Sequence, residues 1–87
     1  MTVRFATAIH AVGVQTGGEL VVVDLRDGAC LRLNASGARI WRGLESGLAV
    51  EEIAREIAGR FGIDQTRAAA DVAAFLEDLR ARGLLAS

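Results

Sequence analysis

The chain has 87 residues, 52% of them hydrophobic, and its ten basic and eleven acidic residues give a net charge of −1. This balance excludes the broad basic surface that binding to a phosphate backbone requires, so we expect no nucleic-acid partner. The single cysteine cannot form an internal disulfide, and no apolar run is long enough for a signal peptide or a membrane span. We therefore expect one cytoplasmic domain over residues 1–87, with no membrane partner.

The first third of the chain predicts a small antiparallel sheet. Small and β-branched residues favour a first strand over residues 3–11, and the segment GVQTGG at 13–18 favours a turn after it. Residues 19–25 (ELVVVDL) predict a second strand because they are rich in valine. Asp27 and Gly28 are a hairpin signal between this strand and the next apolar run.

Residues 29–33 predict the third strand. Because side chains alternate along a strand, Cys30 and Arg32 should share one face, and Leu31 and Leu33 the other. An Asn-Ala-Ser turn follows directly, so the end of this strand should lie close to the start of a helix.

Helical periodicity then takes over. Ser36 is the expected N-cap of a first helix that runs to about residue 45 and buries Trp41. A second helix is expected over residues 50–61, where apolar side chains recur at every fourth position, with Gly62 as its stop.

The third helix should begin after Asp64 as N-cap and end at Gly83. Its apolar stripe is expected to consist of Val72, Phe75, Leu76 and Leu79. At 100° per residue, one side of that stripe carries Arg67, Asp71 and Asp78, and the other carries Glu77 and Arg80. An apolar surface with a charged rim suits the recognition of a peptide.

No group of residues predicts catalysis or metal binding. His10 is the only histidine and has no cluster of cysteines or carboxylates at ligand spacing around it. Cys30 has Ala29 and Leu31 as neighbours, which supply neither the base nor the positive charge that activates a thiol. We therefore expect no enzyme activity and no cofactor.

Four segments together resemble the PqqD-like family, also called RiPP recognition elements, which bind the leader segments of ribosomally made precursor peptides. They are VVVDLRDGACLRLN at 21–34, ASGARIW at 35–41, LAVEEIAREIAGRFGID at 48–64 and DVAAFLEDLRARGLL at 71–85. They occur in the order and spacing of the family and span most of the chain. The resemblance implies an α+β fold similar to a winged helix-turn-helix, with a three-stranded antiparallel sheet followed by three helices.

The resemblance also implies where a peptide would bind. A leader would add as a further strand along the third strand and lie against the third helix. Carried over by position, the site would comprise Cys30, Leu31, Arg32, Leu33, Arg67, Asp71, Ala74, Phe75 and Asp78.

Three functional settings follow. The chain looks most like the free-standing leader-binding protein of lasso-peptide pathways, whose partners are a leader-cleaving cysteine protease and an ATP-dependent macrocyclase. The alternative is the chaperone of pyrroloquinoline-quinone synthesis, which presents its peptide to a radical SAM enzyme. A winged-helix DNA-binding regulator is a remote third, because the third helix and its N-cap carry more acidic than basic residues.

Overall fold

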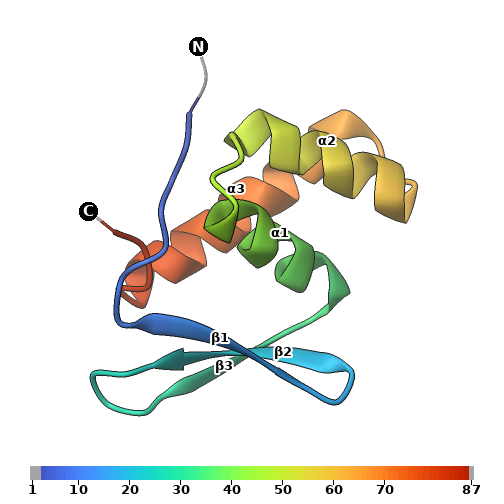
Figure 1. The fold of residues 1–87 in the computed structure, drawn as a ribbon. Coiled ribbons are helices and arrows are strands. Elements are labelled where there is room, and N and C mark those ends of the chain that lie inside the picture. Colours follow the sequence, from blue (N-terminus) through green and yellow to red (C-terminus); the bar gives the residue numbers. More distant parts are fainter. Residues whose placement is uncertain (1–2, 87) are drawn as a thin grey trace.

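The computed structural model describes residues 3–86 and contains three strands followed by three helices (Figure 1). The strands form one antiparallel sheet in the order β1-β2-β3. Their bounds are Ala11–Thr16 for β1, Glu19–Asp24 for β2 and Cys30–Leu33 for β3; the helices are α1 (Ala35–Glu45), α2 (Val50–Phe61) and α3 (Gln65–Ala81). The predicted fold class and the order of elements are confirmed.

The start of the sheet differs from the prediction. Residues 3–10 form two isolated bridges, at Arg4 and Thr7, instead of a strand. The first strand begins only at Ala11, so the predicted glycine-rich turn shrinks to Gly17 and Gly18. Gly17 has φ of +58°, a conformation that glycine adopts without a steric penalty.

Gly13 lies inside β1, although the glycine-containing segment 13–18 was predicted to be a turn. A Cβ atom at this position would lie 2.7 Å from the indole Nε1 of Trp41. The glycine therefore allows the strand to approach the buried indole, while β-branched Val12, Val14 and Thr16 supply strand propensity around it. Composition alone favoured a turn because it does not show what packs against a glycine.

The helix ends follow local capping rules. The N-cap of α1 is Asn34, whose side chain accepts a hydrogen bond from the backbone N–H of Gly37 at 2.8 Å, so the prediction of Ser36 was wrong by two residues. Asp64 caps α3 as predicted by accepting from the N–H of Arg67 at 3.1 Å. Gly62 ends α2 in the left-handed conformation with φ of 65°.

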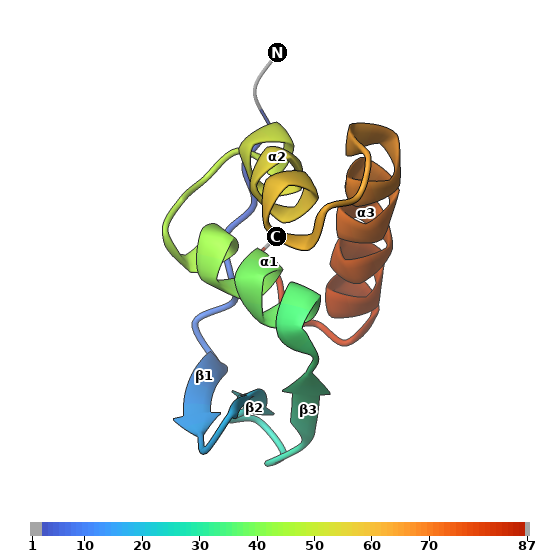
Figure 2. The ribbon, with the colours of Figure 1, turned by 90° about the vertical axis from the view of Figure 1, so that its right-hand side faces the viewer.

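The helices cover one face of the sheet, and the core lies between them (Figure 1). Trp41 of α1 is fully buried and is the largest side chain of the core. Leu20 and Val22 of β2 point into it from the sheet, and Ile53 and Leu79 come from α2 and α3. In the second view, α1 lies between the sheet and α2, and α3 stands on the same side of the molecule as β3 (Figure 2).

None of the helices in residues 3–86 is long and apolar enough to cross a membrane.

Candidate functional site

The outer edge of β3 has no strand beside it within the described residues, because β3 is the last strand of the sheet. In an antiparallel pair, residues alternate between those that bond to the partner and those that point away. Asp24 donates its N–H to the oxygen of Ala29, so Leu31 and Leu33 should also bond to β2. The N–H and C=O groups of Cys30 and Arg32 then face the open edge.

Helix α3 stands on the same side of the molecule as this edge (Figure 2). No Cα atom of β3 lies within 8 Å of a Cα atom of α3, and both elements lie wholly within the described residues. Side chains of both elements, including Leu33, Leu76 and Leu79, join the same core cluster between them.

Two cavities lie near the two ends of β3. The first, of about 320 Å³, lies where β3 runs into α1 and is lined there by Asn34, by Phe61 of α2 and by Arg67 and Asp71 of α3. The second, of about 220 Å³, lies at the start of β3 and is lined by, among others, Cys30, Leu31, Arg82 and Leu84. The end of β3 thus faces the start of α3, and its start faces the end of α3.

The side chain of Phe75 is half-buried and packs toward α1. In the sequence, Phe75 lies between Asp71, which lines the first cavity, and Arg82, which lines the second. Its Cε1 atom would be 3.3 Å from a Cβ at Gly37, so the absence of a side chain at Gly37 makes room for the ring. The neighbouring Ala74 is exposed. Helix α3 therefore offers an apolar middle between its charged ends.

Each rim carboxylate of α3 has an arginine one turn away. Asp71 lies 4.0 Å from Arg67, and Asp78 lies 3.1 Å from Arg82. All four side chains are about half exposed or more, so each pair adds only about 0.3–0.5 kcal/mol to stability. These groups are therefore available for a ligand.

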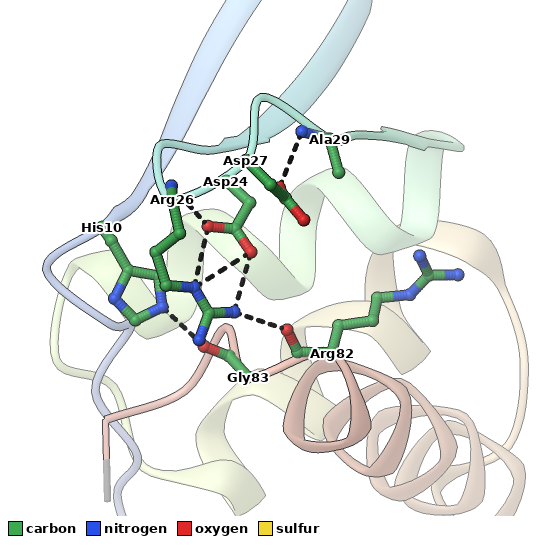
Figure 3. Close-up of polar contacts among 7 residues, drawn as sticks. All are labelled: His10, Asp24, Arg26, Asp27, Ala29, Arg82 and Gly83. Carbon is green, nitrogen blue, oxygen red and sulfur yellow. Dashed lines mark hydrogen bonds and ion pairs between the residues drawn. The ribbon is translucent and has the colours of Figure 1, made fainter.

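Arg26 ties the turn between β2 and β3 to the end of α3 (Figure 3). Its Nη2 atom donates to Oδ2 of Asp24 at 2.8 Å and to the backbone oxygen of Arg82 at 3.0 Å. His10 Nε2 lies 2.7 Å from the oxygen of Gly83 and donates to it. These contacts set the position of α3 relative to the start of β3, beside the second cavity.

Asp24 is the one buried charged residue among the described residues, with 7% of its surface exposed. Hydrogen bonds from the side chain and then from the backbone N–H of Arg26 lower the pKa of Asp24 from 3.8 to about 2. The same carboxylate raises the pKa of Arg26. This pair is therefore charged throughout the physiological pH range.

The predicted site residues divide into three groups. Leu31 of β3 lines one cavity together with Cys30, and Arg67 and Asp71 of α3 line the other. Ala74, Phe75 and Asp78 lie on α3 but line neither cavity. Arg32 is exposed, with 78% of its side chain accessible, and Leu33 is buried in the core with 6% of its surface exposed.

Sequence reasoning missed several residues that build the same region. They come from the end of β2 and the turn after it, from the N-cap of α1, from the end of α2 and the loop after it, and from the segment after α3: Asp24, Arg26, Asn34, Phe61, Ile63, Arg82 and Leu84. The Asp24-x-Arg26 spacing is a possible signal for the ion pair, but only the fold brings it to the end of α3. A further cavity of about 330 Å³, beside Val3 and Phe5, contains none of the predicted site residues.

Within residues 3–86, no group of three or more histidine, cysteine or carboxylate side chains is placed to hold a metal ion.

The family model described as coenzyme PQQ synthesis protein D (PqqD) matches residues 19–85. The chain belongs to the PqqD family. A search of curated protein sequences gave no match.

Two solved structures resemble this PqqD-family chain over nearly its whole length. TbiB1 in complex with the TbiA(β) leader peptide is 31% identical, with a TM-score of 0.85, and the match covers 92% of this chain and 93% of that one. A lasso peptide synthetase B1 complexed with the leader peptide is 25% identical, with a TM-score of 0.88, over 97% of this chain and 99% of that one. Both neighbours therefore bind leader peptides.

Proposed function

We propose that this protein binds the leader segment of a ribosomally synthesised precursor peptide by strand addition to the free edge of β3. The observation that carries the proposal is an unpaired strand edge with a cavity at each end. An exposed edge invites pairing with another chain, and a peptide strand would satisfy it. The leader complexes of the two structural neighbours support the same assignment.

The binding energy would be divided between backbone and side chains. The leader would exchange hydrogen bonds with the backbone of Cys30 and Arg32, which gives affinity with little dependence on sequence. The four residues of β3 span about 13 Å, so a leader segment of about six to eight residues would reach both cavities. Apolar side chains of the leader, such as an aromatic residue and a proline, would fill these cavities and give specificity.

The side chains that we assign to peptide contact are Cys30, Leu31, Arg67, Asp71, Ala74, Phe75 and Asp78. Arg32 would contribute chiefly through its backbone, and Leu33 would support the strand from the core.

The partners of such a protein would be enzymes that act on the bound precursor. We assign it to lasso-peptide biosynthesis in the cytoplasm, as a single recognition domain without catalytic activity of its own. It would present the precursor to a leader-cleaving cysteine protease and to an ATP-dependent macrocyclase. By holding the leader, it would raise the effective concentration of the substrate at these enzymes.

A second candidate is the peptide chaperone of pyrroloquinoline-quinone synthesis, which presents its peptide to a radical SAM enzyme. The name of the matching family model favours this alternative. The lasso peptide synthetase subunit that matches 97% of the chain favours the first assignment.

Fluorescence-anisotropy titration tests the proposal. Labelled leader peptides from a lasso precursor and from a pyrroloquinoline-quinone precursor, each taken from the same genome as this chain, are titrated with the protein. We expect saturable binding of the lasso leader and none of a scrambled leader of the same composition. Preferential binding of the other precursor would favour the chaperone, and binding of neither would refute leader recognition.

A further inference from the structure

Arg32 lies on the face of the sheet that points away from the helices, since the neighbouring Leu33 is buried on the other face. The side chain of Arg32 is 78% exposed. Within residues 3–86 its ion pair is with Glu19 of β2, with 3.9 Å between Nε and Oε1. That distance is too long for a hydrogen bond, and the Glu19 side chain is itself 51% exposed. The guanidinium of Arg32 can therefore bind a second carboxylate.

The strand register places Arg32 directly beside the position of an added strand. Val21 pairs with Val14 on β1 and with Arg32 on β3, so these three side chains form one row across the sheet. Because β3 is an outer strand, the row ends at Arg32 (Figure 2). A peptide strand paired with β3 would lie about 4.8 Å away and would place one outward-facing side chain beside the guanidinium.

The charges around that position favour an acidic leader residue. Arg32 is the only charged residue of β3 and of its row. Opposite charges on adjacent positions of neighbouring strands attract, and like charges repel. Glu19 approaches the Nε atom of Arg32 from the side of β2, so both Nη groups can donate to a carboxylate on the side of the leader.

We propose that the side chain of Arg32 selects leaders that carry an aspartate or a glutamate beside it on the outward face. This inference rests on the proposed function, in which the backbone of Arg32 contributes to affinity. The backbone bonds would hold a strand of almost any sequence. The guanidinium would distinguish leaders by the charge at one position.

The alternation of side chains along a strand predicts where the acidic residue stands in the leader. The cavities lie on the side of the helices, because Ile57 lines the first one and Val22 and Leu84 line the second. Leader side chains that fill the cavities therefore point away from the outward face. The acidic residue would stand an odd number of positions from a cavity-filling residue.

A charge-swap cycle between protein and peptide tests this selection. The probes are the labelled lasso leader from the same genome as this chain and variants in which each aspartate or glutamate in turn becomes lysine. Each peptide is titrated by anisotropy against wild type, Arg32→Glu and the control Arg55→Glu. Arg55 is exposed on α2, and its substitution makes the same change in net charge. Circular dichroism verifies that both variants fold.

One leader position should respond to both sides of the cycle. Lysine there should weaken binding to wild type about fivefold, and Arg32→Glu should weaken binding of the unaltered leader by a similar factor. The lysine leader and Arg32→Glu together should bind within about twofold of the original pair. Arg55→Glu should follow wild type with every peptide.

Three results would overturn selection by Arg32. The first is that wild type binds the leader but Arg32→Glu restores binding of none of the lysine variants. The second is that wild type binds a lasso leader that has no aspartate or glutamate. The third is that Arg55→Glu restores binding equally, which would assign the effect to net charge. Failure of wild type to bind the unaltered leader would instead refute the proposed function itself.

Discussion

Gly13 and Trp41 illustrate how a missing side chain shapes this molecule. The indole of Trp41 is fully buried, and its Nε1 atom has no hydrogen-bond partner among the described residues. A Cβ atom at position 13 would lie only 2.7 Å from it. The close approach of β1 to α1 therefore depends on glycine at this position.

Gly13→Ala should lower the free energy of unfolding by about 1–3 kcal/mol, because the new methyl group overpacks against the indole. The matched control is Gly59→Ala, since a Cβ at Gly59 in the interior of α2 would meet nothing within 4 Å. That change should raise stability by about 0.5–1 kcal/mol through helix propensity. Urea unfolding measures both, and equal effects of the two substitutions would contradict this packing.

The second prediction at this scale concerns Asp24 and acid. Since the pKa of Asp24 is lowered to about 2 in the folded protein, its ionised form stabilises the fold above about pH 4. This contribution is lost as the pH falls from about 4 towards 2. Asp24→Asn should therefore be less stable than wild type at pH 7, and the difference should shrink towards pH 2.

Thermal unfolding of both proteins between pH 7 and pH 2 measures this difference. The same gap in melting temperature at pH 5 and pH 2 would show that the carboxylate charge contributes nothing to folding.

At the scale of elements, α3 and β3 build the proposed site from opposite sides. Substitution of the rim carboxylates tests the part played by α3. Asp71→Ala and Asp78→Ala should each weaken leader binding about two- to fivefold, since exposed charges contribute to orientation more than to affinity. Glu77→Ala is the matched control, because it removes the same charge from the opposite flank of the apolar stripe.

Anisotropy titration of the three variants gives the comparison, with circular dichroism to verify the fold. If Glu77→Ala weakens binding as much as the other two, the leader does not run along the Asp71–Asp78 flank of α3.

The elements also show what the sequence predicted and what it did not. The helices were predicted closely because each has a periodic apolar face and a local stop, as at Gly62 in α2 and Gly83 after α3. The first strand was placed too early, because its glycine is explained only by Trp41, which lies far along the chain. The sequence therefore predicted the elements that are determined by neighbouring residues, and it missed the bound that depends on a distant contact.

The same limit applies to the site. The resemblance to a known family indicated the pairing of β3 with α3, but several residues that line the cavities come from other elements. Phe61 ends α2 and Asn34 caps α1, and neither has a sequence signal that points to a ligand. The sequence did not decide whether Leu33 is buried in the core. The alternation of side chains along β3 places Leu33 on one of two faces, but it does not show which face the helices cover.

At the scale of the whole molecule, a small core holds a sheet with one covered and one open face. The covered face anchors β2 through Leu20 and Val22, and the outer edge of β3 has no further strand beside it within residues 3–86. A peptide strand could therefore be added at this edge without unfolding any described part of the chain.

Amide hydrogen exchange, followed residue by residue by NMR with and without the leader peptide, tests the central claim most directly. Strand addition predicts that the amides of Cys30 and Arg32 exchange rapidly in the free protein and become protected when the leader binds. The amides of Leu31 and Leu33, already bonded to β2 by the strand register, should change much less. Saturable leader binding with no new protection at Cys30 and Arg32 would contradict the account.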